Sequence, residues 1–589
     1  ACTFNQAEQA NLTSFARSRV DGLGRPLSTR VYAIGDTARS ATGGTEVAKA
    51  TYNDTAASLT PGAAVTVVTE KAAGDGQFSR TETQFDGLGR AVKQSVRLND
   101  AGTDRVTSYD YNASGLVRDI LAPRGDGVSG TVTMRTAYDP LGRPLTTSEV
   151  GGATLIQHAY DGLTHTLQQT VPAAGSGTVD DGSERSLART TTDAAGQVVK
   201  IEERSGGTLA APVFAATTYR YDGAGRTSKM TDPDGAVTTM THDYTGNRLS
   251  ITSENDTSTT ADNRTWTYAY DGNNQMLSTT EPVPAGKTAA EFTHSTEYDD
   301  LGRVVREKPA TRGMTNAQLD ELKIGERTHT YDIAHSSLPR LSGKANFQVG
   351  KLAYTTTKDR NASTVIQTVN RYDNNGHLTS ASQDVPGLAG LIPGLDKLQA
   401  DTTIDPAGIT ESSELRAFDT GGVQTFIGVK TDVDYDRDGT PQQVSFALGG
   451  KNMTIRHDRN TAGLISKRVT NTQNTSGFGA PTVDFGHDKY GRITSLTAKI
   501  GATQRYKQTL GYLQNDEIGH ITEQLGGTAE GTLTTTYTYD PRKQLKTAVQ
   551  SASTTPAAGT KGYIGLNTSY TYTPGGRIGS AAVASAQPG

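Results

Sequence analysis

One short signature recurs from one end of this chain to the other: an aromatic residue, Asp, two variable residues, Gly and Arg. A unit that returns every 20 to 50 residues or so is typical of a repeat architecture, in which each copy packs against its neighbours. The repeat therefore constrains the fold more than any other feature. In the four clearest copies the aromatic, Asp, Gly and Arg positions are Phe85, Asp86, Gly89 and Arg90; Tyr138, Asp139, Gly142 and Arg143; Tyr221, Asp222, Gly225 and Arg226; and Tyr298, Asp299, Gly302 and Arg303.

Each copy has the pattern of a β-hairpin. Before Tyr221, polar and aromatic residues alternate, which is the period-two pattern of a half-exposed strand. The Asp222 carboxylate can accept hydrogen bonds from backbone amides a few residues on, and Gly225 supplies a positive φ that other residues adopt only at a cost. Arg226 then begins the return strand. Because these residue types recur so often, we interpret the Asp and Arg positions as turn and sheet scaffolding and not as catalytic groups.

Further copies of the repeat are degenerate but traceable. The aromatic position accepts Tyr, Phe or His, so we expect the flat ring to matter more than the hydroxyl. Long amphipathic Tyr and Arg side chains can also stack on one another. The worn copies include Tyr111-Asn112, Tyr160-Asp161, His242-Asp243, Tyr270-Asp271, Tyr372-Asp373, Tyr435-Asp436, His457-Asp458, His487-Asp488 and Tyr539-Asp540.

The composition indicates a large, thin sheet. With 34% hydrophobic and 6% aromatic residues, 589 residues supply little material for a thick core, yet the 65 Gly fall in turns between stretches of Val, Thr, Ile and Tyr. Such a sheet must close or stack, because long open edges aggregate. The net charge of −5 argues against nucleic-acid binding. No apolar stretch approaches a membrane span, so we expect no direct membrane insertion, and the single Cys2 excludes an intrachain disulfide framework.

Four segments follow from the distribution of the repeats. We expect an N-terminal segment with one divergent repeat (1–80), the regular repeats (81–383), an apolar insertion rich in Pro and Gly (384–430) and further repeats (431–589). The apolar insertion either plugs the interior or contacts a partner. Short helices are predicted over Met314–Lys323, capped by Thr315 or Asn316, and more weakly over Pro284–Phe292.

Few motifs carry chemistry. Asp434, Asp436 and Asp438 match the first half of a calcium loop, but Ser445 stands where the closing Glu belongs, which leaves a weak candidate site. Arg124-Gly125-Asp126 spells an integrin-binding tripeptide, which in so short a match favours adhesion only slightly. No catalytic residue and no cofactor site is predicted, so we expect no enzyme activity in this chain.

The Tyr-Asp repeats resemble those of the RHS, or YD-repeat, family, which includes bacterial RHS toxins, the B and C components of insecticidal Tc toxin complexes, and animal teneurins. The resemblance covers about residues 15 to 580. It implies an all-β fold in which a long antiparallel strip of hairpins spirals into a hollow shell. In bacterial members the shell encloses a toxic effector and holds it inactive. The Asp-Pro cleavage signature of such toxins has its nearest counterpart at Asp405-Pro406, in mid-chain and without its partner.

The leading hypothesis is therefore a structural shell of an RHS or Tc-type toxin, secreted or exported by a bacterium. Its expected partners are an encapsulated effector polypeptide and other subunits of a toxin complex or secretion system. The effector and any protease activity would lie outside this segment. The alternative is a cell-surface adhesion module of the teneurin or wall-associated type.

Overall fold

The computed structural model describes residues 14–33, 43–53, 65–74, 76–99, 101–152, 154–169, 186–208, 210–254, 264–333, 347–385, 392, 395–419, 421–448, 451–472, 479–513, 517–526, 531–552 and 566–585. Within these ranges the chain contains forty strands, one short α-helix and one 3-10 helix. All forty strands belong to one sheet. The prediction of an all-β chain with one or two short helices is confirmed.

The first half of the strip carries the most regular repeats. Its strands are β1 (Ser14–Val20), β2 (Pro26–Ala33), β3 (Thr45–Asn53), β4 (Val65–Gly74), β5 (Gln77–Phe85), β6 (Ala91–Arg97), β7 (Asp104–Tyr111), β8 (Val117–Pro123), β9 (Thr131–Tyr138), β10 (Pro144–Glu149), β11 (Thr154–Asp161), β12 (Thr164–Gln169), β13 (Ser186–Thr192), β14 (Val198–Gly207), β15 (Pro212–Tyr221), β16 (Thr227–Thr231), β17 (Val237–His242), β18 (Arg248–Glu254), β19 (Arg264–Tyr270) and β20 (Met276–Thr280).

The second half contains both helices, η2 (Ala289–Phe292) and α2 (Asn316–Glu321). Its strands are β21 (Thr293–Tyr298), β22 (Val304–Lys308), β23 (Arg327–Tyr331), β24 (Leu352–Lys358), β25 (Thr364–Tyr372), β26 (Leu378–Asp384), β27 (Lys397–Ile404), β28 (Thr410–Phe418), β29 (Gln424–Tyr435), β30 (Pro441–Leu448), β31 (Lys451–Arg459), β32 (Ile465–Thr472), β33 (Pro481–His487), β34 (Ile493–Ile500), β35 (Thr503–Tyr512), β36 (Ile518–Leu525), β37 (Leu533–Tyr539), β38 (Leu545–Ala552), β39 (Leu566–Tyr572) and β40 (Ile578–Ser585).

Each strand pairs antiparallel with the next strand in the sequence, so the sheet is a continuous meander. The register shifts where a strand reaches the aromatic residue of a repeat, as it does at Phe85, Tyr221 and Tyr298. Such bulges bend a strand and increase its twist. The repeat that makes each turn therefore also helps to curve the strip.

The turns between strands fall alternately on the two edges of the strip, because consecutive strands run in opposite directions. The Asp-Gly-Arg turns lie on one edge, which we call the repeat-turn rim; examples are 86–90 between β5 and β6 and 112–116 between β7 and β8. The other connections lie on the opposite edge, which we call the loop rim; an example is 98–103 between β6 and β7. The two rims therefore differ in sequence along most of the strip, although the loop rim also contains Asp-led turns of the same geometry at 232–236, 359–363 and 419–423.

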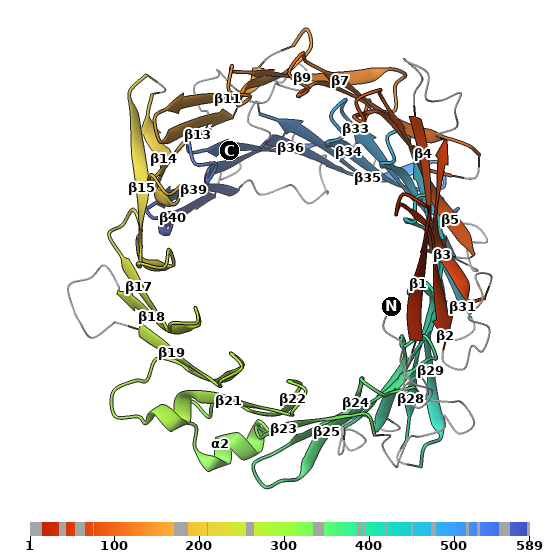
Figure 1. Cartoon of the computed structure of the whole chain (residues 1–589), viewed down its shortest axis with the longest axis vertical. Coiled ribbons are helices and arrows are strands. Elements are labelled where there is room, and N and C mark those ends of the chain that lie inside the picture. Colours follow the sequence, from red (N-terminus) through yellow and green to blue (C-terminus); the bar gives the residue numbers. More distant parts are fainter. Residues whose placement is uncertain are drawn as a thin grey trace.

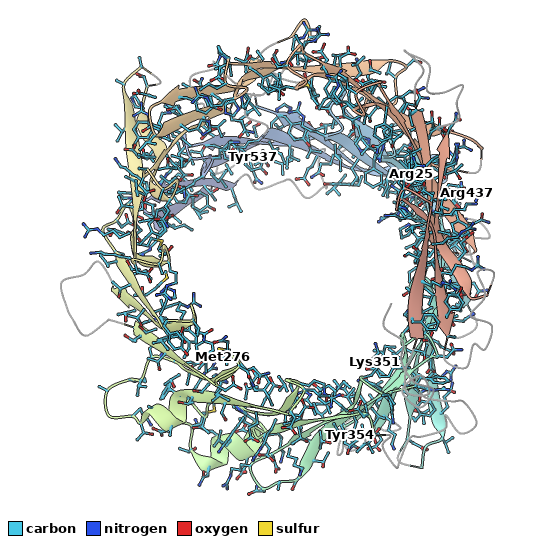
Figure 2. All side chains as sticks on the ribbon, in the orientation of Figure 1. Arg25, Met276, Lys351, Tyr354, Arg437 and Tyr537 are labelled. Atoms are coloured by element: carbon cyan, nitrogen blue, oxygen red, sulfur yellow. The ribbon has the colours of Figure 1, made fainter. Side chains whose placement is uncertain are left out.

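The strip winds around an open centre (Figure 1). It passes from β1 through β9, β17 and β25 until β29 comes back beside β4. We call β1–β28 the first coil and β29–β40 the second coil. The side chains drawn in Figure 2 project from both faces of the strip and leave its centre open. The single-layer sheet expected from the composition is thus wound through more than one full turn.

The hydrophobic core is sparse along this wall. Tyr32, Ala73 and Ala353 are fully buried, but most described side chains are only half-buried, as a one-layer sheet requires. In α2, Thr315 is the N-cap and Leu319 is buried, whereas Leu322 forms the C-cap and is exposed. The helix is shorter than the predicted Met314–Lys323, because it ends at Glu321.

In the apolar insertion (384–430), positions 386–391, 393–394 and 420 lie outside the described residues, so the predicted role of the insertion as a plug or partner contact stays a prediction. Ile392, which is described, is half exposed. Strands β27 and β28, within 384–430, pair with their neighbours like all the others. The sheet therefore runs through this part of the chain without a break.

Candidate functional site: the repeat turns and the seam between coils

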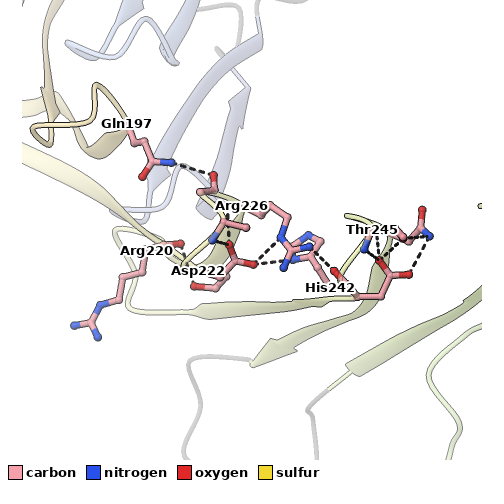
Figure 3. Close-up of polar contacts among 11 residues, drawn as sticks. Gln197, Arg220, Asp222, Arg226, His242 and Thr245 are labelled. Atoms are coloured by element: carbon pink, nitrogen blue, oxygen red, sulfur yellow. Dashed lines mark hydrogen bonds and ion pairs between the residues drawn. The ribbon is translucent and has the colours of Figure 1, made fainter.

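The repeat turn is held by one carboxylate. In the third clear copy, Oδ1 of Asp222 accepts the backbone amides of Ala224 (2.9 Å) and Arg226 (3.0 Å), and Oδ2 accepts Nε of Arg226 (2.7 Å), as Figure 3 shows. The Asp222 amide donates to the Arg226 carbonyl (2.8 Å), and Gly225 has a φ of +80°. A side chain with three internal donors has little capacity left for catalysis, and these contacts close the turn.

The other three clear copies repeat this geometry. The glycines have φ values of +77°, +78° and +79° at Gly89, Gly142 and Gly302. Amide donation from Arg90 lowers the pKa of Asp86, and donation from Arg303 does the same for Asp299. The carboxylates are therefore charged acceptors at neutral pH. The corresponding side-chain contacts join Asp86 to Leu88 and Arg90, Asp139 to Leu141 and Arg143, and Asp299 to Leu301 and Arg303.

The repeat tyrosine connects each repeat to the one before it. The Arg90 guanidinium lies 4.5 Å from the ring centre of Tyr111, and the Tyr111 hydroxyl donates to the carbonyl of Ala91 (2.6 Å). Tyr331 repeats both contacts with Arg303 and with the carbonyl that follows it. Other tyrosine hydroxyls that donate to the residue after the Arg position of the preceding repeat are those of Tyr52, Tyr138, Tyr160, Tyr221, Tyr270, Tyr298, Tyr372, Tyr435, Tyr512, Tyr539 and Tyr572.

In these copies the hydroxyl therefore makes a contact of its own beside that of the ring, and the greater importance of the ring stays a prediction. The hydroxyl bonds a backbone carbonyl that the hairpin itself leaves available, while the ring supports the Arg side chain of the neighbour. Phe85 keeps only the ring. The signal that could have shown this is the predominance of Tyr over Phe at the position, since a purely apolar contact would accept either residue.

The three candidate calcium ligands have protein partners. Asp434 accepts a hydrogen bond from Gln443 (2.8 Å), and Asp438 accepts the amide of Thr440 (3.0 Å). Asp436 accepts a hydrogen bond from Gln442 (2.9 Å) and stands at the Asp position of a repeat turn. Among the described residues, no group of three or more His, Cys, Asp or Glu side chains is arranged to hold a metal ion.

The Arg124-Gly125-Asp126 tripeptide lies on the loop rim, between β8 and β9. Arg124 and Asp126 form an ion pair with each other. Gly125 contacts the second coil: its amide donates to the carbonyl of Lys489 (3.0 Å), and its carbonyl accepts from Asn460 Nδ2 (2.7 Å). The tripeptide is thus part of a contact between coils, which short-motif reasoning did not predict.

These contacts belong to a seam in which the repeat-turn rim of the second coil meets the loop rim of the first. The contacts join residues from 335 to 374 positions apart in the sequence. Near its start, the Tyr435 ring lies directly against the backbone of Gly74. Further along, Lys543 donates to Gln169 (3.3 Å).

Carboxylates of the first coil accept most of the polar seam contacts. Glu149 accepts Lys489 Nζ at 2.7 and 2.8 Å on its two oxygens and also accepts the Tyr490 hydroxyl. Burial raises the pKa of Glu149, but the donors Lys489 and Tyr490 outweigh it, and the pKa lies below its ordinary value. A second anchor contains two more carboxylates: Asp234 accepts Thr573 (2.9 Å) and the Gly575 amide (2.7 Å), and Asp232 pairs with Arg577 (3.3 Å).

Comparison with known proteins agrees with this geometry. The RHS Repeat family matches residues 190–236 and 221–258, so the chain contains RHS repeats. The crystal structure of TcdB2-TccC3-Cdc42 superposes with a TM-score of 0.65 at 12% identity over 97% of this chain. TcdB2-TccC3 without its hypervariable C-terminal region gives 0.59 at 13% identity over 97%.

The chain spans about a third of the length of those solved chains, 32% and 33%. No curated protein sequence matches it. The likeness shows that this chain shares its fold with part of those solved chains. Among the described residues, no helix is long and apolar enough to cross a membrane.

Proposed function

We propose that this chain is the wall of a toxin shell that encloses a polypeptide effector and keeps it inactive until delivery. The observation that carries the proposal is the winding of one unbroken strip past a full turn around an open centre, with the second coil seated on the first (Figure 1). A solid globular domain would fill that space with its own side chains. Here the described residues surround it (Figure 1 and Figure 2).

The chemistry of the wall supports a passive role. The repeat carboxylates of Asp86, Asp139, Asp222 and Asp299 are each engaged by the amides and the Arg of their own turn. Catalytic groups need a reacting partner within reach, and these side chains already have internal ones. We therefore assign any toxic chemistry to the cargo and not to this wall.

The similar structures support the choice of partners. Their titles describe complexes of TcdB2 with TccC3, one of them with Cdc42. By analogy, we propose that the present chain works beside other subunits of a bacterial toxin complex and is exported with them. In the adhesive alternative, the Arg124-Gly125-Asp126 tripeptide would bind cells, but its charges pair with each other and its glycine lies in the seam.

A protection experiment tests the proposal. The protein is purified from the cells that make it, and the accompanying polypeptides are identified by mass spectrometry before and after trypsin treatment. Encapsulation predicts a non-wall polypeptide that survives trypsin in the native particle and is cut once urea opens the wall. Cleavage at equal rates in both states would reject encapsulation. Saturable binding to cells without any protected polypeptide would favour the adhesive alternative.

A further inference from the structure

We propose that the seam between the coils is the line along which the wall opens, and that the first-coil carboxylates Glu149, Asp232 and Asp234 are its latch. The proposal rests on the proposed shell function for its biological meaning. Its physical content, a seam that opens before the sheet does, concerns the contacts of this chain alone.

The bonds that hold the two coils together across the seam differ from those that hold neighbouring strands together within a coil. Within a coil, each pair of neighbouring strands shares a ladder; β33 and β34, for example, pair from Pro481↔Ile500 to His487↔Ile493. Across the seam, the bonds between described residues are isolated from one another, and most of them involve a side chain. Breaking a few side-chain bonds separates the coils there, whereas separating strands requires a whole ladder to break together. The seam is therefore the weaker joint.

The charges of the latch are arranged asymmetrically. The carboxylates are on the first coil, and the groups that donate to them, Lys489, Tyr490, Thr573, the Gly575 amide and Arg577, are on the second. Arg124, on the first coil, also attracts Glu149, and the Lys489 ammonium lies 5.1 Å from the Tyr490 ring centre. Glu149, Asp232 and Asp234 all lie on the loop rim of the first coil. Loss of their negative charge therefore weakens the Glu149 contact and the Asp232–Asp234 contact at once.

The direction of the pH effect follows from Glu149. Its pKa in the folded chain lies below the ordinary 4.5. The stability that it contributes is thus fully present above about pH 4.5 and is lost as the pH falls through the folded-state pKa. Acid also weakens the repeat turns, because their Asp carboxylates accept hydrogen bonds as well. A substitution that removes the seam charge at neutral pH separates the two effects.

The Gly125 amide reports on the seam directly, because it donates to Lys489 of the other coil. Hydrogen exchange of the peptide containing Gly125 is measured at pH 7 in the unmodified chain and in Glu149→Gln. We expect hydrogen exchange at Gly125 to be about tenfold faster or more in the variant. Exchange at Gly142 should be unchanged, because the hydrogen bond of its amide closes a turn within one repeat. Tyr490→Phe, which removes one donor and no charge, should give a smaller increase.

Glu297→Gln is the matched control. Glu297 is an exposed carboxylate that pairs with Arg306 within the first coil, 3.3 Å away. It should leave exchange at Gly125 unchanged. Equal exchange at Gly125 in Glu149→Gln and the unmodified chain would overturn the proposal. So would acceleration at Gly125 and Gly142 alike, because the sheet would then loosen together with the seam. Neither outcome depends on cargo, so failure of the latch is distinguishable from failure of encapsulation.

Discussion

The turns of the first coil and those of the second coil share one frame but present different residues at their tips. In the first coil, Leu23, Leu88, Leu141 and Leu301 stand at the tips with 77 to 78% of their surface exposed. In the second coil the tips include Lys489 and Tyr490, which are half-buried against the first coil.

The comparison shows that different residues of the repeat have different roles. Asp, Gly and Arg fix the turn, while the two residues between Asp and Gly are free to meet whatever lies beside that part of the strip. In the second coil they meet the loop rim. In the first coil, the described residues show no such contact with a second rim. Substitutions in the frame and at the tips can show whether the two coils share the frame and whether the tips are separable from it.

The largest effect should come from glycines of the frame. Gly225 and Gly576 have φ values of +80° and +82°, and a Cβ on either would meet a glutamine Nε2, at 2.8 and 2.9 Å. Replacing either by Val should destabilise its turn by about 1–3 kcal/mol, because a β-branched residue is strained at positive φ. Local hydrogen exchange should report similar losses in both coils. Very different losses would show that the frame is not shared.

A tip of the second coil should matter less than a glycine but more than a tip of the first coil. Lys489→Leu puts an apolar residue into the seam and leaves Glu149 with one donor fewer. We expect a loss of about 1–2 kcal/mol, because a partly buried charge loses a partner. Denaturant unfolding, monitored by a probe at the seam, measures this loss of stability. Full stability in this variant would contradict the importance of the Glu149 contact.

The hydroxyl of a repeat tyrosine should have a moderate effect. Tyr111→Phe keeps the ring beside Arg90 and removes the bond to the Ala91 carbonyl. A loss of about 0.5–1.5 kcal/mol is expected for one intramolecular hydrogen bond. Thermal unfolding of this variant beside Phe85→Tyr, at a copy that naturally lacks the hydroxyl, isolates the contribution. No loss of stability in Tyr111→Phe would support the expectation that the ring matters more than the hydroxyl.

The smallest effect should come from a tip of the first coil. Leu141 is 78% exposed, so Leu141→Lys should change stability by no more than about 0.5 kcal/mol, as surface substitutions usually do. Calorimetry of Leu141→Lys beside Lys489→Leu compares a tip of the first coil with a tip of the second. A large loss in Leu141→Lys would mean that the exposed tips are part of the frame.

The local part of this fold could be predicted from the sequence because its partners are close together in the chain. Asp222 and Arg226 are four residues apart, so residue type and spacing were enough to indicate the turn and the positive φ of Gly225. The capping of α2 by Thr315 could be predicted for the same reason.

The rest could not be predicted because its partners are distant and their spacing varies. The bond from Tyr111 to Ala91 spans 20 residues, whereas that from Tyr331 to Val304 spans 27, so no fixed period reveals it. The seam contact between Gly125 and Asn460 spans 335 residues. It depends on the summed curvature of all the strands between them, which no local pattern specifies.

The central claim, that the strip returns upon itself and seats its second coil on its first, is tested most directly by a disulfide across the seam. A Cβ on Gly127 would lie 3.5 Å from the Cβ of Asn460, within the range that a disulfide requires. In a Cys2→Ser background, Gly127→Cys with Asn460→Cys should oxidise to a linked peptide pair that mass spectrometry detects. The same Asn460→Cys with Gly151→Cys should stay reduced. Free thiols in the Gly127 pair, with the sheet intact by circular dichroism, would contradict the wound strip.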